Sequence, residues 1–344
     1  MNSYYHKETM NALFYSLPVG MYLKRQIKLQ MKKILITTLA VLVSAIMHGQ
    51  QNPQYSQYIF NMMVSNPAYA GSKDVLNLNG LYRSQWTGLE GSPSTQTLSV
   101  DAAAGKAIGL GLYLINDNLG AQRQTAFFGS FAYRFQISED ARLSFGLTGG
   151  ASQFSIDGSK LTSDNPDPSI PLSLDSRIIP DAKGGIFFNT ARFYAGLSVS
   201  DLLSHIHFQK EIGIIQGRHY FFTTGYVLDM GENFKFKPSI LLKEDFKGPA
   251  NIDLNAFVLF YEKVWLGASY RTGAKIPGSG SGNSLRLENA VALITELYAT
   301  DKLRIGYSYD ITGSALKNYS SHEISLGYFF YKKQDTKMVS PRYF

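Results

Sequence analysis

The eight residues Leu303-Arg304-Ile305-Gly306-Tyr307-Ser308-Tyr309-Asp310 carry the pattern on which the fold prediction rests. Large apolar side chains alternate with small, polar or charged ones, and successive side chains of a β-strand point to opposite faces. One face of this strand is therefore apolar, and the other carries Arg304 and Asp310. In a membrane β-barrel the apolar face contacts lipid and the other face lines the lumen.

The same alternation recurs from Val75 to Tyr331, in segments such as 108–114, 143–148, 264–271 and 324–330. We predict 14 strands, near residues 74–83, 94–103, 106–116, 123–136, 141–153, 179–189, 191–199, 217–229, 234–244, 252–261, 264–272, 284–296, 300–309 and 322–331. An even number is expected of a bacterial single-chain barrel. The 22 Tyr, 22 Phe and 31 Gly fit this architecture but would also fit a soluble β-sandwich.

The connections between the predicted strands distinguish the two folds. Even-numbered connections are short, as at Ala104-Gly105 and Glu262-Lys263, whereas odd-numbered ones are usually longer, as at 154–178 and 200–216. Membrane barrels have short periplasmic turns and long outer loops, so short and long connections alternate along the chain. A soluble β-sandwich has no physical requirement for such an alternation. The sequence therefore predicts an all-β fold, a transmembrane antiparallel β-barrel of about 14 strands preceded by a signal peptide.

The start of the sequence has the pattern of an export signal. Met31-Lys32-Lys33 is basic, residues 34–46 are almost wholly apolar, and Gly49 marks the predicted cleavage position. Thirteen apolar residues are too few for a spanning helix, which needs about 20, although an N-terminal anchor helix is the alternative. The predicted divisions are 1–30 as an upstream over-extension of the reading frame, 31–49 as signal peptide, 50–73 as N-terminal periplasmic segment, 74–331 as outer-membrane barrel and 332–344 as C-terminal tail.

The composition excludes several classes of function. The chain has no cysteine, so disulfides, thiolate zinc sites and cysteine nucleophiles are unavailable. The formal net charge is +7, but the first 49 residues hold six of the 33 basic residues and one of the 26 acidic ones. The remaining 27 basic and 25 acidic residues nearly balance, so the sequence predicts no nucleic-acid partner.

The motifs predict no catalytic, cofactor-binding or metal site. Phosphate-binding and dinucleotide-binding glycine motifs are absent, and Gly278-Ser279-Gly280-Ser281-Gly282 lacks the central Ser of a nucleophile elbow, so we interpret it as an outer loop. His322-Glu323 lacks the second His of a zinc motif. His205 and His207 could hold a metal from one face of a strand, and Asp164-Asn165-Pro166-Asp167 could hold calcium. We interpret both as polar loop or turn residues.

Six arginines fall inside predicted strands: Arg83, Arg123, Arg134, Arg271, Arg286 and Arg304. The alternation could bring some of them to the lumen. There they would either tune a pore or pair across a closed interior with acids such as Glu288, Glu296 and Asp310. The sequence leaves both roles open. The tail carries Lys332, Lys333, Lys337 and Arg342, which we interpret as solvated, with a periplasmic partner as the alternative.

Several segments resemble the PorP/SprF family of outer-membrane proteins. The resemblance is carried by Gln54-Tyr55-Ser56-Gln57-Tyr58, Asn66-Pro67-Ala68-Tyr69-Ala70-Gly71, Tyr82-Arg83-Ser84-Gln85-Trp86, Leu266-Gly267-Ala268-Ser269-Tyr270-Arg271-Thr272-Gly273 and Arg304-Ile305-Gly306-Tyr307-Ser308-Tyr309-Asp310. It extends from about Gln51 to Tyr331. We interpret the turn formers in these segments as structural and the rings of Tyr55, Tyr58, Tyr69 and Tyr82 as parts of an interfacial girdle.

The resemblance implies a non-enzymatic component of the type IX secretion and gliding-motility system in the cell outer membrane. Such a protein would support secretion or surface attachment of a large adhesin, or couple to the periplasmic secretion ring. The implied partners are outer-membrane lipid, a secreted adhesin or other type IX cargo, and periplasmic secretion-system components. A general diffusion porin or small-solute transporter is the alternative, because a fold does not fix a function.

Overall fold

The computed structural model describes residues 54–161, 174–203, 217–246, 248–274, 289–313, 316–330 and Tyr343. The predicted signal peptide and the 30 residues before it lie outside this set. Within the described residues, we find no helix with the length and apolar character needed to cross a bilayer.

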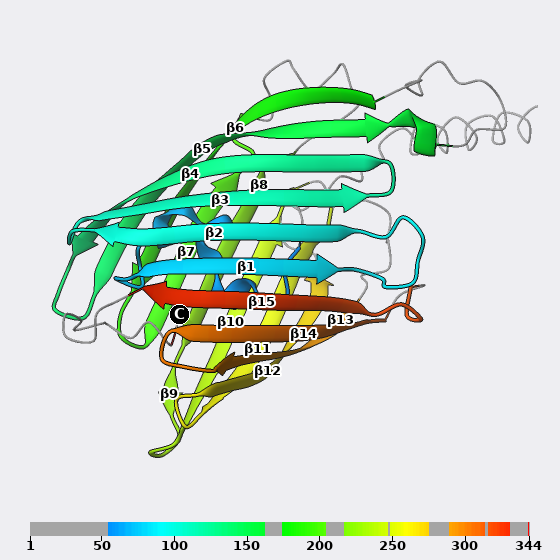
Figure 1. The fold of residues 1–344 in the computed structure, drawn as a ribbon. Helices are drawn as coiled ribbons and strands as arrows, with labels where there is room; N and C mark the ends of the chain where they lie inside the picture. Colours follow the sequence, from blue (N-terminus) through cyan, green and yellow to red (C-terminus); the bar gives the residue numbers. More distant parts are fainter. Residues whose placement is uncertain are drawn as a thin grey trace, which may run out of the picture. The chain divides into compact units, whose positions relative to one another are not determined.

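The described chain forms one antiparallel sheet in which each strand pairs with its neighbours along the sequence (Figure 1). The strands are β1 (Leu76–Ser84), β2 (Ser94–Ala104), β3 (Ile108–Leu119), β4 (Gln122–Gln136), β5 (Arg142–Asp157), β6 (Leu174–Asn189), β7 (Phe193–Ser200), β8 (His219–Tyr226), β9 (Leu228–Asp229), β10 (Phe234–Glu244), β11 (Ala250–Phe260), β12 (Val264–Ala274), β13 (Ala290–Tyr298), β14 (Leu303–Thr312) and β15 (Ser321–Phe330). Because β8 and β9 are separated by one residue and both pair with β10, they count as one strand of the barrel. The 15 strand segments of the described chain therefore make 14 barrel strands.

The first and last strands close the sheet. β1 pairs with β15 from Leu76↔Phe330 to Ser84↔His322, and β10 pairs with β11 on the far side. A closed barrel satisfies the strand backbone internally, which the water-free membrane core requires. The predicted 14-stranded antiparallel barrel is thus confirmed. β6 begins at Leu174, five residues earlier than predicted, because it pairs with β5 as far as Asp157, the last residue of that strand.

The predicted alternation of the side chains is also confirmed. In β14, Ile305 and Tyr307 are 41% and 39% exposed, whereas Arg304 and Ser308 are buried. The same order holds in β3, where Leu110, Leu112 and Leu114 are exposed between buried neighbours. The outer wall therefore presents a continuous apolar surface to lipid.

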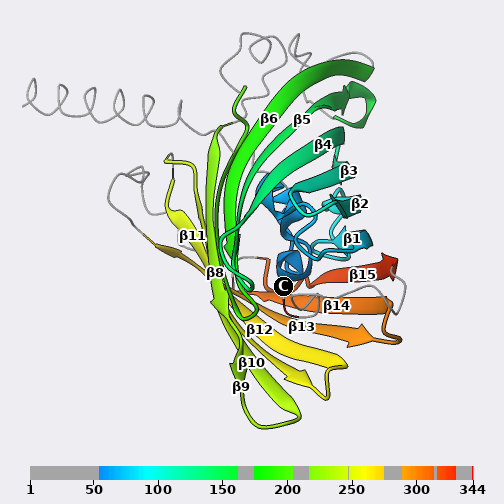
Figure 2. The same cartoon turned by 90° about the vertical axis from the view of Figure 1, so that its left-hand side faces the viewer.

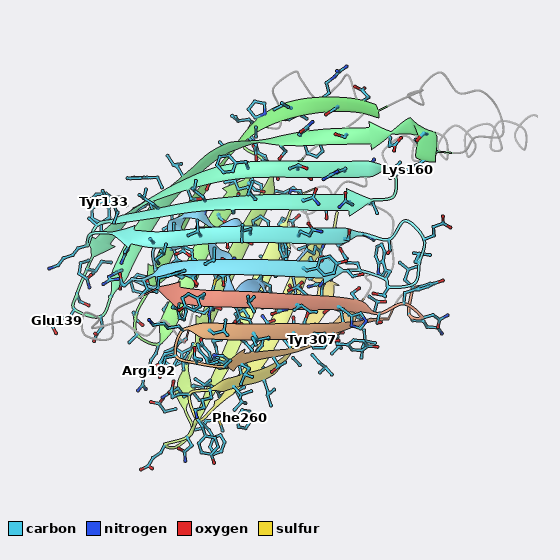
Figure 3. The ribbon with its side chains drawn as sticks, in the orientation of Figure 1. Tyr133, Glu139, Lys160, Arg192, Phe260 and Tyr307 are labelled. Carbon is cyan, nitrogen blue, oxygen red and sulfur yellow. The ribbon has the colours of Figure 1, made fainter. Side chains whose placement is uncertain are left out.

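The two ends of the barrel differ in the length of their connections. One end has short turns such as 105–107, 190–192 and 261–263, and the other has longer loops such as 85–93 and 313–320. Two connections at the second end are also short, Gly120-Ala121 and residues 245–249. We call the first the periplasmic end and the second the cell-surface end, as in other membrane barrels. Figure 3 shows Glu139 and Arg192 at the periplasmic end and Lys160 at the other.

The described residues before β1 lie inside the barrel, whereas the sequence predicts a periplasmic segment at 50–73. Three 3-10 turns, η1 (Tyr58–Phe60), η2 (Met62–Val64) and η3 (Pro67–Tyr69), follow one another there. We call residues 54–75 the plug; Figure 2 shows it in blue, enclosed by the sheet.

The plug changes the interpretation of the N-terminal tyrosines. Tyr58 and Tyr69 are buried in the lumen, and the Tyr55 hydroxyl contacts Thr97 Oγ1 at 2.9 Å. The predicted interfacial girdle is wrong for these three rings, because the plug carries them away from the lipid surface. Tyr82 does lie on the outer face.

The depth of the outer wall in the membrane can be tested with Leu112→Arg. Leu112 lies on the outer face between Val100 and Gly129 of the adjacent strands, whereas Ile137 follows β4 at the periplasmic end. An outward Arg costs about 2–4 kcal/mol at the bilayer midplane and about 0–1 kcal/mol near the interface. We expect these losses in the free energy of unfolding for Leu112→Arg and Ile137→Arg, respectively. Denaturant titration of the barrel in phospholipid vesicles measures both, and equal losses would contradict the assignment.

Candidate functional site

The candidate site is the lumen, which the plug crosses from wall to wall. The hydroxyl of Tyr58 accepts a hydrogen bond from Asn255 of β11 at 2.7 Å. The amide of Asn61 donates to Ser99 of β2 at 2.7 Å. On a third side, the backbone oxygen of Ser65 accepts from Ser198 of β7 at 2.7 Å. Contacts with strands around the whole barrel fix the plug within the lumen.

Glycines in the wall allow the plug backbone to approach the sheet. A Cβ added to Gly146 of β5 would lie 2.2 Å from the backbone nitrogen of Ala68, and one added to Gly109 of β3 would lie 1.9 Å from the oxygen of Ala70. A Cβ on Gly185 of β6 would lie 2.2 Å from the side-chain oxygen of Asn66. Such separations are impossible for real atoms, so these wall positions accept only glycine while the plug is in place.

Asn66 and Pro67 set the conformation of the plug at its centre. Asn66 is the N-cap of η3 and its side-chain oxygen accepts from the backbone N–H of Ala68 at 3.0 Å, while Pro67 occupies the first turn. Both positions suit these residue types, because Asn is a good cap and Pro has no N–H to satisfy. The Asn66 amide also donates to the backbone oxygen of Ile186 at 3.0 Å. The predicted structural role of this pair is confirmed.

A buried ion cluster holds the plug at the cell-surface end. Arg83 contacts Asp310 at 2.7 Å and Glu323 at 3.0 Å. The carboxylate of Glu323 accepts from the backbone N–H groups of Ser56 at 3.0 Å and Gln57 at 2.8 Å. The Ser56 hydroxyl donates to Asp310 at 2.6 Å. The plug therefore supplies donors to two carboxylates that are removed from water.

A second set of ionic contacts lies at the periplasmic end. Asp74 pairs with both Arg134 and Arg142, which flank the turn at 137–141. Arg304 lies 3.6 Å from Glu296 and donates to Asn77 at 2.8 Å. The plug is thus bound by charged groups at each of its ends.

One residue of the C-terminal tail reaches the same end. The ammonium of Lys237 donates to the backbone oxygen of Tyr343 at 3.0 Å and lies 4.6 Å from the ring centroid of Trp265 and 5.5 Å from that of Phe60. The Tyr343 hydroxyl donates to Glu262 at 3.2 Å. The four basic tail residues lie outside the described residues.

Of the two roles left open for the strand arginines, the structure shows ion pairing. Arg83, Arg134 and Arg304 pair as described, and Arg271 contacts Asp253 at 3.0 Å. Arg123 is exposed, and Arg286 and Glu288 lie outside the described residues. The predicted acids Glu296 and Asp310 do pair with arginines. The sequence analysis did not identify Asp74, Asp253 and Glu323 as partners of these arginines. The alternation of side chains along β11 and β15 already places Asp253 and Glu323 on the inward face.

In the part of the chain that the structure describes, no three His, Asp or Glu side chains group in a way that could hold a metal ion. His322 and Glu323 belong to strand β15, and Tyr307 Oη and His322 Nδ1 lie 2.8 Å apart. His205, His207 and the segments 164–167 and 278–282 lie outside the described residues.

Little free space separates the plug from the wall around Asn66. A cavity lined by Tyr58, Asn66 and Gly196 has a volume of about 10 Å³, about the minimum for one water molecule. A larger depression of about 880 Å³ is lined by outward-facing side chains such as Phe131 and Leu197. Because it opens on the lipid side of the wall, it adds no space to the lumen.

Comparison with known proteins places this chain in a family. The model of the family described as type IX secretion system membrane protein PorP/SprF matches residues 47–328. No curated protein matches the chain.

Among solved structures, the CymD monoaromatic hydrocarbon channel is 12% identical, with 84% of this chain and 97% of that chain covered and a TM-score of 0.47. A Pseudomonas aeruginosa FadL homologue is 9% identical, with coverages of 82% and 96% and a TM-score of 0.42. The Acinetobacter baumannii outer membrane protein Omp33 is 9% identical, with coverages of 76% and 100% and a TM-score of 0.42. These likenesses concern the fold alone. The family match covers most of the barrel and includes the plug, and the chain therefore belongs to the PorP/SprF family of type IX secretion system outer-membrane barrels.

Proposed function

We propose that this barrel is a non-enzymatic docking component of the type IX secretion system, which supports secretion or surface attachment of a large adhesin or couples to the periplasmic secretion ring. The observation that supports the proposal is the plug, because it occupies the route that a solute would take. Partners then bind to the loops, the periplasmic turns or the outer wall. Residues 31–49 direct export as a cleaved signal peptide in this proposal.

The alternative function, diffusion of small solutes, requires a water-filled lumen. The plug contacts β2 through Asn61, β7 through Ser65 and β11 through Tyr58, so it would have to leave before a channel opened. Its departure would remove the donors of Ser56 and Gln57 from Glu323 and Asp310, and water would have to replace them. The net loss for each hydrogen bond to a charged group exchanged in this way is about 1.5–3 kcal/mol.

Deletion of the gene tests the secretion role. We expect one large adhesin to remain inside the cell while other type IX cargo is still secreted, as measured by surface immunolabelling and by protein in the medium. Arrest of all cargo would instead make the barrel part of the common machinery. If neither the adhesin nor the other cargo changed, the proposed function would be wrong.

Conductance in planar bilayers separates the docking role from the porin alternative. We expect the purified barrel to pass little current, and Gly146→Val to open a channel because its side chain collides with the plug at Ala68. Gly149→Val is the matched control, since Gly149 lies on the same strand with no atom within 4 Å of an added Cβ. The gel mobility of unheated samples verifies that each variant is folded. Steady porin-like current through the unchanged protein would favour the alternative.

A further inference from the structure

The plug has a direction, which its contacts with strand β2 reveal. β2 runs from Ser94 near the cell-surface end to Ala104 at the periplasmic end. Along it, Thr97 contacts Tyr55, Ser99 accepts from Asn61, and Asp101 accepts from the backbone N–H of Gly71 at 3.0 Å. Later residues of the plug therefore contact later residues of β2. The plug runs in the same direction as β2, from the cell-surface end towards the periplasm.

The first residues of the plug lie close to the cell-surface loops. Ser56 and Gln57 bind Glu323, which is the third residue of β15, and Arg83 is the last but one residue of β1. Asp310 precedes the loop 313–320 at the same end. Three strands thus place the start of the plug in the cell-surface third of the lumen.

The last residues of the plug lie at the opposite end. Asp74 pairs with Arg134 and Arg142 on either side of the periplasmic turn 137–141. β1 then begins at Leu76 and returns towards the cell surface. The segment therefore crosses the lumen once before the first strand begins.

We propose that the cell-surface mouth of the barrel is a peptide-binding site that holds the chain's own amino-terminal segment, with its amino end directed to the cell exterior. The ligand is a neutral, amide-rich peptide, Gln54-Tyr55-Ser56-Gln57-Tyr58. Glu323 binds its backbone N–H groups, Asp310 binds the Ser56 hydroxyl, and Arg83 balances both carboxylates. The side chain of Gln57 adds to this recognition, because it donates to the backbone oxygen of Glu323 at 3.0 Å and accepts from the Ser325 hydroxyl at 2.7 Å.

This arrangement differs from an amino-terminal segment that enters from the periplasm. A segment entering from that side would reach β1, which also starts there, without crossing the lumen. Here Ser56 and Gln57, near the start of the described chain, lie on the side of the long loops, bound to Glu323. The inference concerns the route of the chain and does not rest on the proposed role in secretion.

Cysteine labelling of intact cells tests the direction, because the natural chain has no cysteine and each variant carries a single thiol. The variants are Gln54→Cys, Lys160→Cys at the cell surface and Glu139→Cys in a periplasmic turn (Figure 3). With a membrane-impermeant maleimide polymer, we expect Gln54→Cys and Lys160→Cys to give the shifted gel band before permeabilisation. Glu139→Cys should shift only after the outer membrane is opened. A Gln54→Cys thiol that behaves like Glu139→Cys would overturn the inference.

Gln54 is half-buried, which slows the reaction of a thiol at this position. An epitope tag inserted between residues 51 and 52 gives a second measurement. Antibody binding to intact cells supports entry from the cell surface, and binding only after permeabilisation overturns it. Maleimide labelling and antibody binding both report only where the amino-terminal segment lies, and neither depends on adhesin display. The proposed function can therefore fail while this inference holds, and the reverse.

The binding role of Glu323 needs its own variant. Glu323→Gln in the Gln54→Cys background loses one of the two acceptor oxygens that face Ser56 and Gln57. We expect faster maleimide labelling at position 54. Glu296→Gln is the matched control, because Glu296 pairs with Arg304 at the periplasmic end. Unchanged labelling with Glu323→Gln would show that this carboxylate does not hold the segment.

Discussion

The pairing of β1 with β15 is the interaction on which the rest of the structure depends. In the membrane core no water can satisfy a backbone N–H or C=O, and each unsatisfied group costs several kcal/mol. The register from Leu76↔Phe330 to Ser84↔His322 removes both edges of the sheet at once. It also joins residues more than 230 positions apart in the sequence, and thereby creates an interior. The ion cluster of Arg83 and Glu323 exists only because these two strands are adjacent.

The plug removes the inward charges of the closed wall from water, and its own donors offset part of the cost. Inward positions of the wall carry charged side chains, and transferring an ion out of water costs several kcal/mol even after relaxation. Arg83 and Glu323 offset part of that cost by pairing with each other. The remaining acceptor capacity of Glu323 is taken by the N–H groups of Ser56 and Gln57. Plug and wall are therefore complementary in charge as well as in shape, and the wall glycines provide the shape.

The same complementarity links structure to function. A barrel that fills its lumen with its own chain presents loops, turns and an apolar wall to its surroundings. Asp74 anchors the plug between Arg134 and Arg142, next to a turn that faces the periplasmic secretion components in our proposal. At the other end, Ser56 and Gln57 lie beneath the cell-surface loops. One segment thus connects the two ends of the barrel through the lumen.

The sequence by itself determined the barrel, because the determinants of a strand and its faces are local. Alternation in residues 303–310 predicts that Arg304 faces inward and Ile305 faces lipid, and the structure places both there. The family resemblance likewise rested on short contiguous segments. Only the tertiary structure decided where the plug lies and which acid meets which arginine. Ser56 binds Glu323 across 267 residues, and neither residue carries a local signal of the other. Such contacts depend on closure of the sheet, which is a property of the whole chain.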